Sequence, residues 1–270
     1  MDLKMEERFD DASYRVFVEG VRRRYGIDLG QYKEAQMRRR ITSLIRRRGF
    51  SGYAEYFAAV ERDEELRREF LDRITINVSE FFRNPERWED LDRHVLAEIL
   101  AKTTVRLWSA ACAGGEEPYT LAMLVHARRR SFVGVTLLAT DIDEEALARA
   151  RRGRYPESAV RLVPPDLAAR YLVRDGDEYE VVPELKRAVH FRRHDLLRDP
   201  YERGFDLIVN RNVAIYFTDA GKDHLYRELS RSLRPGGYLF VGSTEQIFSS
   251  ERYGLRQVYP FIYHKVGDPA

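Results

Sequence analysis

Apolar residues between about residue 10 and residue 70 recur at helical spacing. One run comprises Phe17, Val18, Val21 and Tyr25, and a second comprises Met37, Ile41, Leu44 and Ile45. Because residues three or four apart share one face of a helix, each run predicts an amphipathic helix with a buried stripe. Glycines in segments 25–28 and 48–52 are typical of helix ends and divide the region. We therefore expect a small all-α domain over residues 1–73.

After segment 74–79 the pattern changes to short apolar runs that alternate with amphipathic stretches. The expected strands are 105–110, 135–139, 189–192, 206–209 and 238–242, and the expected helices include 118–129 and 144–152. This alternation is typical of a mostly parallel sheet covered by helices on both faces. Segment 171–182 has two strand-like arms around Asp175-Gly176, which predicts a β-hairpin insertion. Residues 74–270 are thus expected to form an α/β domain.

Composition restricts the functional classes. Forty-six Lys and Arg residues against forty-four Asp and Glu residues leave a net charge of +2, so the whole-molecule field favours neither nucleic acid nor membrane. The charged N-terminal residues and the lack of a long apolar run predict a cytoplasmic protein without membrane insertion. The single cysteine, Cys112, excludes an internal disulfide and is expected to be buried as a small hydrophobe. His190 and His194 lack a third ligand, so we expect no metal site.

A turn rich in small residues follows the first expected strand. Segment 107–118 runs from the strand through Gly114 and Gly115 into a helix that begins near Pro118. Small residues let the main chain approach a ligand closely, and Asp141 at the end of the next strand can accept hydrogen bonds from ribose hydroxyls. The two signals together predict a ligand that contains adenosine.

The charge of the turn separates two kinds of ligand. A dinucleotide would require a Gly-x-Gly-x-x-Gly turn that leaves helix-terminal amides for its pyrophosphate. Here the turn carries Glu116 and Glu117, which repel phosphate and favour the sulphonium and ammonium groups of S-adenosylmethionine (SAM). The alternative is that these glutamates only favour the helix N-terminus electrostatically.

Five segments, in a characteristic order and spacing along the chain, resemble the motifs of a known family. They are 77–83 (Asn-Val-Ser-Glu-Phe-Phe-Arg), 108–111 (Trp-Ser-Ala-Ala), 115–119 (Gly-Glu-Glu-Pro-Tyr), 139–143 (Ala-Thr-Asp-Ile-Asp) and 211–217 (Arg-Asn-Val-Ala-Ile-Tyr-Phe). Together with Leu-Arg-Pro-Gly-Gly at 233–237, they resemble the chemotaxis-receptor glutamate methyltransferases of the CheR family over nearly the whole chain. The resemblance implies a Rossmann-like class I methyltransferase domain with a hairpin insertion, preceded by the all-α domain.

The resemblance also implies roles for individual residues. Asn77, Ser79 and Arg83 would contact SAM, Glu117 its amino end and Asp141 its ribose. The family's Asn-Leu pair beside the adenine falls on Asp195 and Leu196, and its Cys-Arg-Asn run falls on Asn210, Arg211 and Asn212. Asp195, Asn210 and Ser79 depart from the family's asparagine, cysteine and threonine, which affects the expected affinity more than the expected function.

The implied reaction is methyl transfer from SAM to glutamate side chains of transmembrane chemoreceptors, with S-adenosylhomocysteine as the product. Arg83 and Tyr216 are the candidates that position the acceptor carboxylate. Two alternatives remain open: a class I methyltransferase that acts on RNA or a small molecule, and a non-catalytic domain that binds SAM and signals through a partner. We expect a monomer whose partner is the cytoplasmic domain of a chemoreceptor and not a nucleic acid.

The expected helical domain is locally basic. Residues 15–50 contain eleven Lys or Arg and three Asp or Glu residues, a local excess of eight positive charges. In segment 37–48 the apolar stripe leaves most arginines facing solvent, and Arg38, Arg39, Arg46 and Arg47 are the candidates for docking an acidic receptor helix. A simply solvated face and an RNA-binding face are the competing interpretations.

Overall fold

The structure is a computed structural model that describes residues 9–75 and 79–270. By the contacts along the chain it divides into two compact units. The first, which we call the helical unit, is Met1–Asn77 with Tyr216–Lys222; the second, the sheet unit, is Val78–Ile215 with Asp223–Ala270. The expected domain boundary at 73/74 falls inside the last helix of the helical unit, which continues to Thr75.

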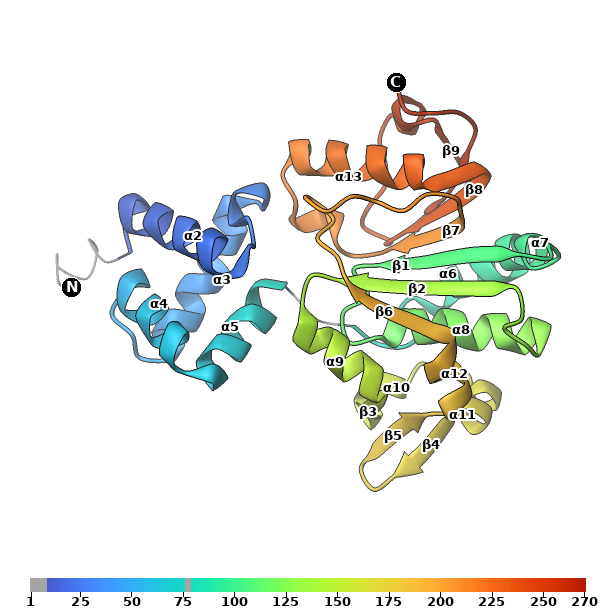
Figure 1. The fold of residues 1–270 in the computed structure, drawn as a ribbon, viewed down its shortest axis with the longest axis horizontal. Coiled ribbons are helices and arrows are strands. Elements are labelled where there is room, and N and C mark those ends of the chain that lie inside the picture. The colour runs from blue at the N-terminus through green and yellow to red at the C-terminus, as the bar shows by residue number, and fades with distance from the viewer. Residues whose placement is uncertain (1–8, 76–78) are drawn as a thin grey trace. The chain divides into compact units, whose positions relative to one another are not determined.

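The helical unit is built from α2 (Asp11–Tyr25), a 3-10 turn (Leu29–Gln31), α3 (Glu34–Arg47), α4 (Tyr53–Arg62) and α5 (Glu64–Thr75), coloured blue to cyan in Figure 1. Asp10 caps α2 by accepting from the Ser13 N–H, and Gly26 ends it at φ 74°. The predicted stripe of α3 is confirmed, since Met37, Ile41, Leu44 and Ile45 are all buried. Aromatic rings of Phe17, Tyr53 and Phe70 pack in the centre.

The sheet unit contains a seven-stranded sheet of order β6-β2-β1-β7-β8-β10-β9. Its strands are β1 (Val105–Ala110), β2 (Val135–Asp141), β6 (Val189–Arg193), β7 (Phe205–Asn210), β8 (Leu233–Val241), β9 (Leu255–Tyr259) and β10 (Ile262–Lys265). The first five are mutually parallel, and β10 is antiparallel to both neighbours. All five predicted strands are confirmed, although β8 begins earlier than expected, whereas β9 and β10 were not predicted.

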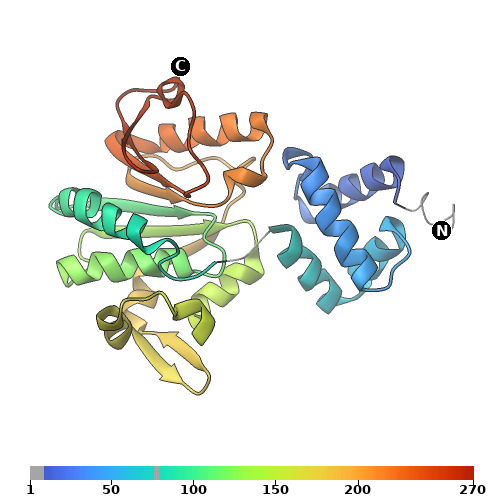
Figure 2. The ribbon, with the colours of Figure 1, turned by 180° about the vertical axis from the view of Figure 1, so that it is seen from behind.

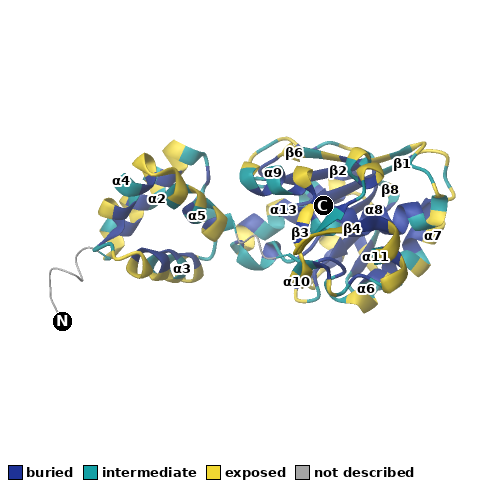
Figure 3. Ribbon diagram, turned by 90° about the horizontal axis from the view of Figure 1, so that it is seen from below, coloured by how far each residue is buried: buried dark blue, intermediate teal, exposed yellow. Residues whose placement is uncertain are grey.

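Helices cover both faces of this sheet (Figures 1 and 2). They are α6 (Pro85–Asp90), a π-helix (Leu91–Leu96), α7 (Ala97–Ile99), α8 (Glu116–Arg129), α9 (Glu144–Arg152) and the part of α13 (Asp219–Ser232) from Asp223 onward. Short 3-10 turns lie at Ala214–Tyr216 and Ser250–Tyr253. The chain passes from β1 through α8 to β2 in one direction across the sheet, and from β7 through α13 to β8 in the other. Right-handed crossovers therefore place α8 and α13 on opposite faces. Buried residues concentrate along the strands between these helices (Figure 3).

The hairpin insertion is confirmed and enlarged. β4 (Leu172–Asp175) and β5 (Glu178–Val181) turn at Gly176, whose φ is 63°, and β3 (Arg154–Pro156) adds a third antiparallel strand in the order β3-β5-β4. Short helices α10 (Glu157–Val160), α11 (Pro165–Tyr171) and α12 (Pro183–Ala188) flank this small sheet. In the part of the chain that the structure describes, no helix is both long and apolar enough to cross a bilayer.

Candidate active site

The carboxyl ends of β1 and β7 mark the place where the order of the sheet reverses. From β1 the chain first builds outward through β2 to β6, and then returns to add β7 and β8 on the other side. Open α/β sheets bind ligands in the crevice at such a switch point. The expected site residues of the sheet unit lie at or just after the carboxyl ends of β1, β2, β6 and β7, or on the segment that enters the unit before α6.

The loop after β1 has an unusual backbone. Ala111, Ala113 and Gly115 have φ values of 64°, 46° and 97°. The left-handed region costs a residue with a Cβ on the order of 1 kcal/mol, so other contacts must hold the two alanines. A Cβ on Gly115 would lie 2.7 Å from the Ala150 Cβ and 2.8 Å from the Tyr155 hydroxyl oxygen, which explains the glycine there.

Asp141 anchors this loop from the end of β2. Its Oδ2 accepts the Ala113 N–H at 2.8 Å and its Oδ1 accepts the Asp143 N–H at 2.9 Å. Burial raises the pKa of this carboxyl to about 6, although the two main-chain hydrogen bonds act in the opposite direction. A carboxylate has about four lone-pair sites, more than its main-chain donors occupy, so Asp141 can accept further hydrogen bonds from ligand hydroxyls.

Glu116 and Glu117 begin α8 at the same edge. Glu117 accepts the Ser109 hydroxyl at 2.8 Å, and burial raises its pKa to about 7 while the positive charge of Arg211 opposes the shift. Burial also raises the pKa of Glu116, whose Oε2 is buried and accepts no hydrogen bond from the described residues. A nearby cationic ligand stabilises the ionised form of a buried carboxylate, which burial alone disfavours.

The β6 end lies beside the β2 end. The His194 N–H donates to the Asp141 carbonyl at 2.9 Å, and the next residues, Asp195 and Leu196, are both buried. Asp195 accepts the Leu197 N–H at 2.8 Å, and burial raises its pKa. His190 is exposed whereas His194 is buried, and within 9–75 and 79–270 no group of three His, Cys, Asp or Glu side chains is placed to hold a metal ion.

The β7 end contributes Asn210 and Arg211. The Asn210 amide donates to the Ala110 carbonyl at 2.9 Å, and its Oδ1 is buried without a partner among the described residues. The buried Arg211 donates to the Arg83 carbonyl at 2.7 Å and to Asn84 Oδ1 at 3.0 Å, and its guanidinium lies over the rings of Trp88 and Phe240. Arg211 thus fixes the turn that contains Arg83 and supplies positive charge to Glu117.

Ser79 and Arg83 lie on the segment that enters the sheet unit, and both are partly buried. Phe82 has a φ of 51°, and its N–H donates to the Thr120 hydroxyl at 3.1 Å, which ties this segment to α8. Asn77, the third residue expected here, lies outside the described residues.

Glu245 is a site residue that the sequence did not reveal. It is buried after β8, and its carboxylate accepts the main-chain N–H groups of Asn212, Val213, Ile215 and Gly242 at 2.5, 2.7, 3.3 and 3.0 Å. Asn212, at φ 62°, is held in a left-handed conformation by this contact. Burial raises the pKa of Glu245 even though four N–H donors lower it. Glu245 therefore shapes the loop that follows β7.

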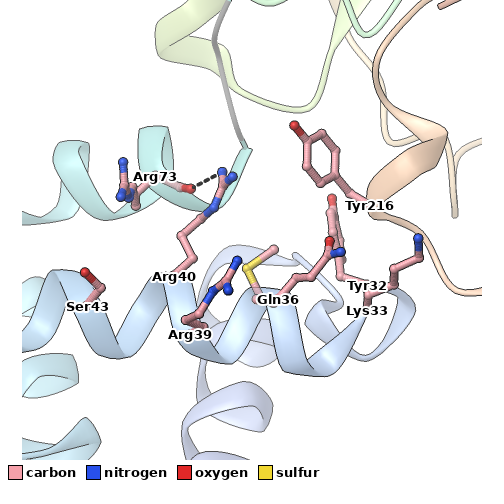
Figure 4. Close-up of a pocket in the computed structure, with 9 residues that line it drawn as sticks. Tyr32, Lys33, Gln36, Arg39, Arg40, Ser43, Arg73 and Tyr216 are labelled. Carbon is pink, nitrogen blue, oxygen red and sulfur yellow. Dashed lines mark hydrogen bonds between the residues drawn. The ribbon is translucent and has the colours of Figure 1, made fainter. Parts of the chain in front are cut away.

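Tyr216 belongs to the helical unit. It lines a pocket of about 520 Å³ together with Tyr32, Lys33, Gln36, Met37, Arg39, Arg40, Ser43 and Arg73 (Figure 4). Four of these side chains are cationic and none is acidic, so among the described residues the pocket wall is positively charged. The Arg40 guanidinium lies 5.7 Å from the centre of the Tyr216 ring.

The docking candidates on α3 differ in their surroundings. Arg39 and Arg46 are exposed, and Arg46 lies over the Phe9 ring. Arg38 is less exposed, since it pairs with Asp11 and donates to the Phe9 carbonyl at 2.7 Å. Arg47 pairs with Glu69 at 2.9 Å. Arg39 and Arg46 therefore have the greater freedom to contact another molecule.

The donor set fits SAM better than a phosphate-bearing cofactor. Glu116, Glu117 and Asp141 place three poorly solvated carboxyls around one loop, and Asn210 Oδ1 adds a buried acceptor without a partner. These groups repel phosphate and can hold ammonium and hydroxyl groups. The expected burial of Cys112 in the same loop is confirmed, and burial raises the pKa of its thiol.

Comparison with known proteins agrees with this geometry. The sequence matches the family models "CheR methyltransferase, SAM binding domain" over residues 77–258 and "CheR methyltransferase, all-alpha domain" over residues 12–75. It is 43% identical over 257 residues to a chemotaxis protein methyltransferase of Listeria monocytogenes, covering 94% of this chain and 98% of that one. It is 32% identical over 255 residues to one of Borreliella burgdorferi, covering 89% of each chain. It is 31% identical over 269 residues to chemotaxis protein methyltransferase 1 of Pseudomonas aeruginosa, covering 95% and 97%. The chain therefore belongs to the CheR family of SAM-dependent methyltransferases.

Proposed function

We propose that this enzyme methylates glutamate side chains of chemoreceptors, forming a methyl ester and S-adenosylhomocysteine. The observation that carries the proposal is the pocket around Tyr216. Its wall contains Lys33, Arg39, Arg40 and Arg73 and no acidic side chain among the described residues, which suits a negatively charged acceptor. The names of the relatives, chemotaxis protein methyltransferases, support a chemoreceptor as the source of that acceptor.

For the cofactor we propose that Glu117 holds the amino group and Asp141 the ribose hydroxyls. Asp195 and Leu196 would border the adenine, and Asn210 Oδ1 would accept a hydrogen bond from the ligand. Ser79 and Asn77 would contact the cofactor from the entering segment. Arg211 and Asn212 would shape the cofactor site, because their contacts tie the β7 loop to the Arg83 turn and to Glu245.

In this reaction the protein has to hold the acceptor carboxylate in line with the methyl group of SAM. A glutamate side chain has a reference pKa of about 4.3, so it is already a carboxylate at neutral pH and needs no general base. SAM supplies a methyl group activated by its positive sulphonium. Arg83 can orient the acceptor carboxylate by charge-assisted hydrogen bonds, and the Tyr216 phenol can donate a further one. Fixing reactants in line can lower the barrier by roughly 7 to 11 kcal/mol at most.

This assignment predicts that Tyr216→Phe and Arg83→Ala lower the rate of methyl transfer from tritiated SAM to a chemoreceptor cytoplasmic fragment. Loss of one hydrogen bond to a charged group costs about 1.5 to 3 kcal/mol, a reduction of roughly 10- to 150-fold. Tyr216→Phe should leave the SAM dissociation constant nearly unchanged. Tyr259→Phe, in a half-buried tyrosine stacked on His94, is the matched control. Full turnover by Tyr216→Phe would show that the Tyr216 hydroxyl has no role in the reaction.

The docking face is tested by charge reversal at Arg39 and Arg46, the two exposed candidates that make no ion pair with Asp11 or Glu69. Arg39→Glu with Arg46→Glu avoids the internal contacts of Arg38 and Arg47, so the bundle should fold. We expect KM for the receptor fragment to rise steeply, and the wild-type reaction to weaken with salt, since exposed charges are screened over about 8 Å at physiological ionic strength. Arg22→Glu with Arg62→Glu makes the same charge change at exposed positions on α2 and α4. Equal KM values for the two double variants would show that the receptor docks elsewhere.

A further inference from the structure

The chain segment that carries Tyr216 is held by main-chain pairing inside the helical unit. The Lys33 N–H donates to the Tyr216 carbonyl at 2.9 Å, and the Thr218 N–H donates to the Gln31 carbonyl at 2.9 Å. Tyr32 and Phe217 form an antiparallel β-bridge between these two hydrogen bonds. The segment therefore takes its position from residues 31–33, far away in the sequence.

Side chains reinforce this bridge. The rings of Tyr32 and Phe217 meet edge to face at 5.3 Å, and Phe217 is buried. The Arg40 guanidinium lies over the Tyr216 ring and also donates to the Arg73 carbonyl at 3.2 Å, as the dashed line in Figure 4 shows. A Cβ on Gly221 would come within 3.4 Å of the Gln31 carbonyl, so the following turn also packs closely on the same strand-like segment.

The residues just before Tyr216 are held by a different part of the molecule. Main-chain N–H groups of Asn212, Val213 and Ile215 are bound by Glu245, in the sheet unit. The chain thus passes from one unit to the other between Ile215 and Tyr216. The main chain of Tyr216 is therefore held by the helical unit, although the residues that precede it along the chain belong to the sheet unit.

We infer that the helical unit is a positioning element of the catalytic machinery, because its Gln31–Lys33 segment holds the main chain of Tyr216. This inference rests on the catalytic role proposed for Tyr216. Lys33 also immediately precedes α3, the helix that carries the docking arginines. The docking face and Tyr216 therefore share one compact unit, and an acceptor bound to α3 lies at a fixed offset from the phenol. Lys33 and Tyr32 act through Tyr216 as positioning residues.

Lys33→Pro is a local test of the bridge. Lys33 has a φ of −60° and Tyr32 is extended at ψ 156°, which are the conformations that proline and the residue before it adopt. Proline removes the N–H that binds Tyr216 and places ring carbon against the Tyr216 carbonyl, whereas Lys33→Ala removes the same side-chain charge and keeps the N–H. We expect kcat of Lys33→Pro to be about 10- to 100-fold below that of Lys33→Ala, because small misplacements of reacting groups cost this much. KM for the receptor fragment and the SAM dissociation constant should match between the two variants.

A second pair of variants, at Tyr32, does not change the charge of the docking face. Tyr32→Ala removes the ring that packs on Phe217 and should lower kcat, whereas Tyr32→Phe keeps the ring and should restore it. If Lys33→Pro does not fold, the Tyr32 pair tests whether the bridge positions Tyr216. Hydrogen exchange of the Thr218 amide reports the bridge without any turnover and should accelerate in Lys33→Pro relative to Lys33→Ala.

The outcomes separate this inference from the proposed function. Loss of rate in Tyr216→Phe with equal kcat in both members of each pair would overturn the inference and leave the proposed function standing. Full rate in Tyr216→Phe would contradict the catalytic role of Tyr216, and the inference would fall with it. Loss of rate in Tyr216→Phe, Lys33→Pro and Tyr32→Ala, with rescue by Tyr32→Phe, supports it.

Discussion

Glu117→Gln should stabilise the protein and weaken SAM binding at the same time. Burial raises the pKa of the Glu117 carboxyl from 4.5 to about 7. Between these two values the folded state holds a proton that the unfolded state has released, so stability falls as pH rises through this window. Each pKa unit corresponds to about 1.36 kcal/mol, which makes the ionised Glu117 a cost on the order of 3 kcal/mol above the window.

Glutamine mimics the protonated side chain and does not titrate. The gain in unfolding free energy of Glu117→Gln over the wild type should therefore be small near pH 5 and should grow by about 2 to 3 kcal/mol by about pH 8. The assay is urea denaturation without cofactor, followed by tryptophan fluorescence. The protein's two tryptophans, Trp88 and Trp108, both lie in the sheet unit, so the signal reports the unit that contains Glu117.

Binding should change in the opposite sense. Calorimetry at about pH 8 should show SAM affinity reduced by about 1.5 to 3 kcal/mol, roughly 10- to 150-fold, because the variant lacks the carboxylate that we propose holds the amino group. Glu89→Gln, at an exposed position on α6, is the matched control and should change neither quantity. A stability difference between Glu117→Gln and wild type that does not vary from pH 5 to pH 8 would refute the raised pKa. Unchanged SAM affinity would refute the assigned role of Glu117.

Two further predictions concern the same site. Asp141→Ala should weaken SAM by about 1.5 to 3 kcal/mol in calorimetry, whereas NAD should bind neither the variant nor the wild type; an unchanged SAM dissociation constant would place the ribose elsewhere. Glu245→Gln replaces one acceptor oxygen by an amide donor that faces main-chain N–H groups, and should lower the unfolding free energy by about 3 kcal/mol, while Glu251→Gln at an exposed position nearby should not.

The parts of the fold that sequence predicted are those with a strong local pattern. The strands β1, β2, β6, β7 and β8 appear as apolar runs or parts of them, and the stripe of α3 has clear helical spacing. β9 and β10 were missed because they end the sheet as an antiparallel pair in which polar residues such as Arg256 and His264 interrupt the apolar positions. β3 was missed because a three-residue strand that ends in Pro156 carries too little pattern.

The residues of the candidate site also differ in whether the sequence could predict their positions. Asp141 could be placed in advance because it ends an apolar strand, and the structure puts it against the loop that follows β1. Glu245 could not, since three of its four main-chain N–H partners lie about 30 residues earlier in the chain and no sequence motif links them to Glu245. The position of Tyr216 in the helical unit depends on the β-bridge between Tyr32 and Phe217. This pairing joins residues far apart in the sequence, and neither segment has a local pattern that predicts it.

The most direct test of the central claim is the chemical nature of the transferred methyl group. The protein is incubated with SAM labelled in its methyl group and with a chemoreceptor cytoplasmic fragment, and the labelled product is then exposed to alkali. Methyl esters of glutamate hydrolyse to methanol, whereas methyl groups on the nitrogen or carbon atoms of RNA do not. We predict that the label enters the receptor fragment and is released as volatile methanol, and that Tyr216→Phe releases far less. Label that stays bound after alkali, or that enters RNA or a small molecule instead of the fragment, would contradict the proposal, and a protein that binds SAM without any transfer would contradict it as well.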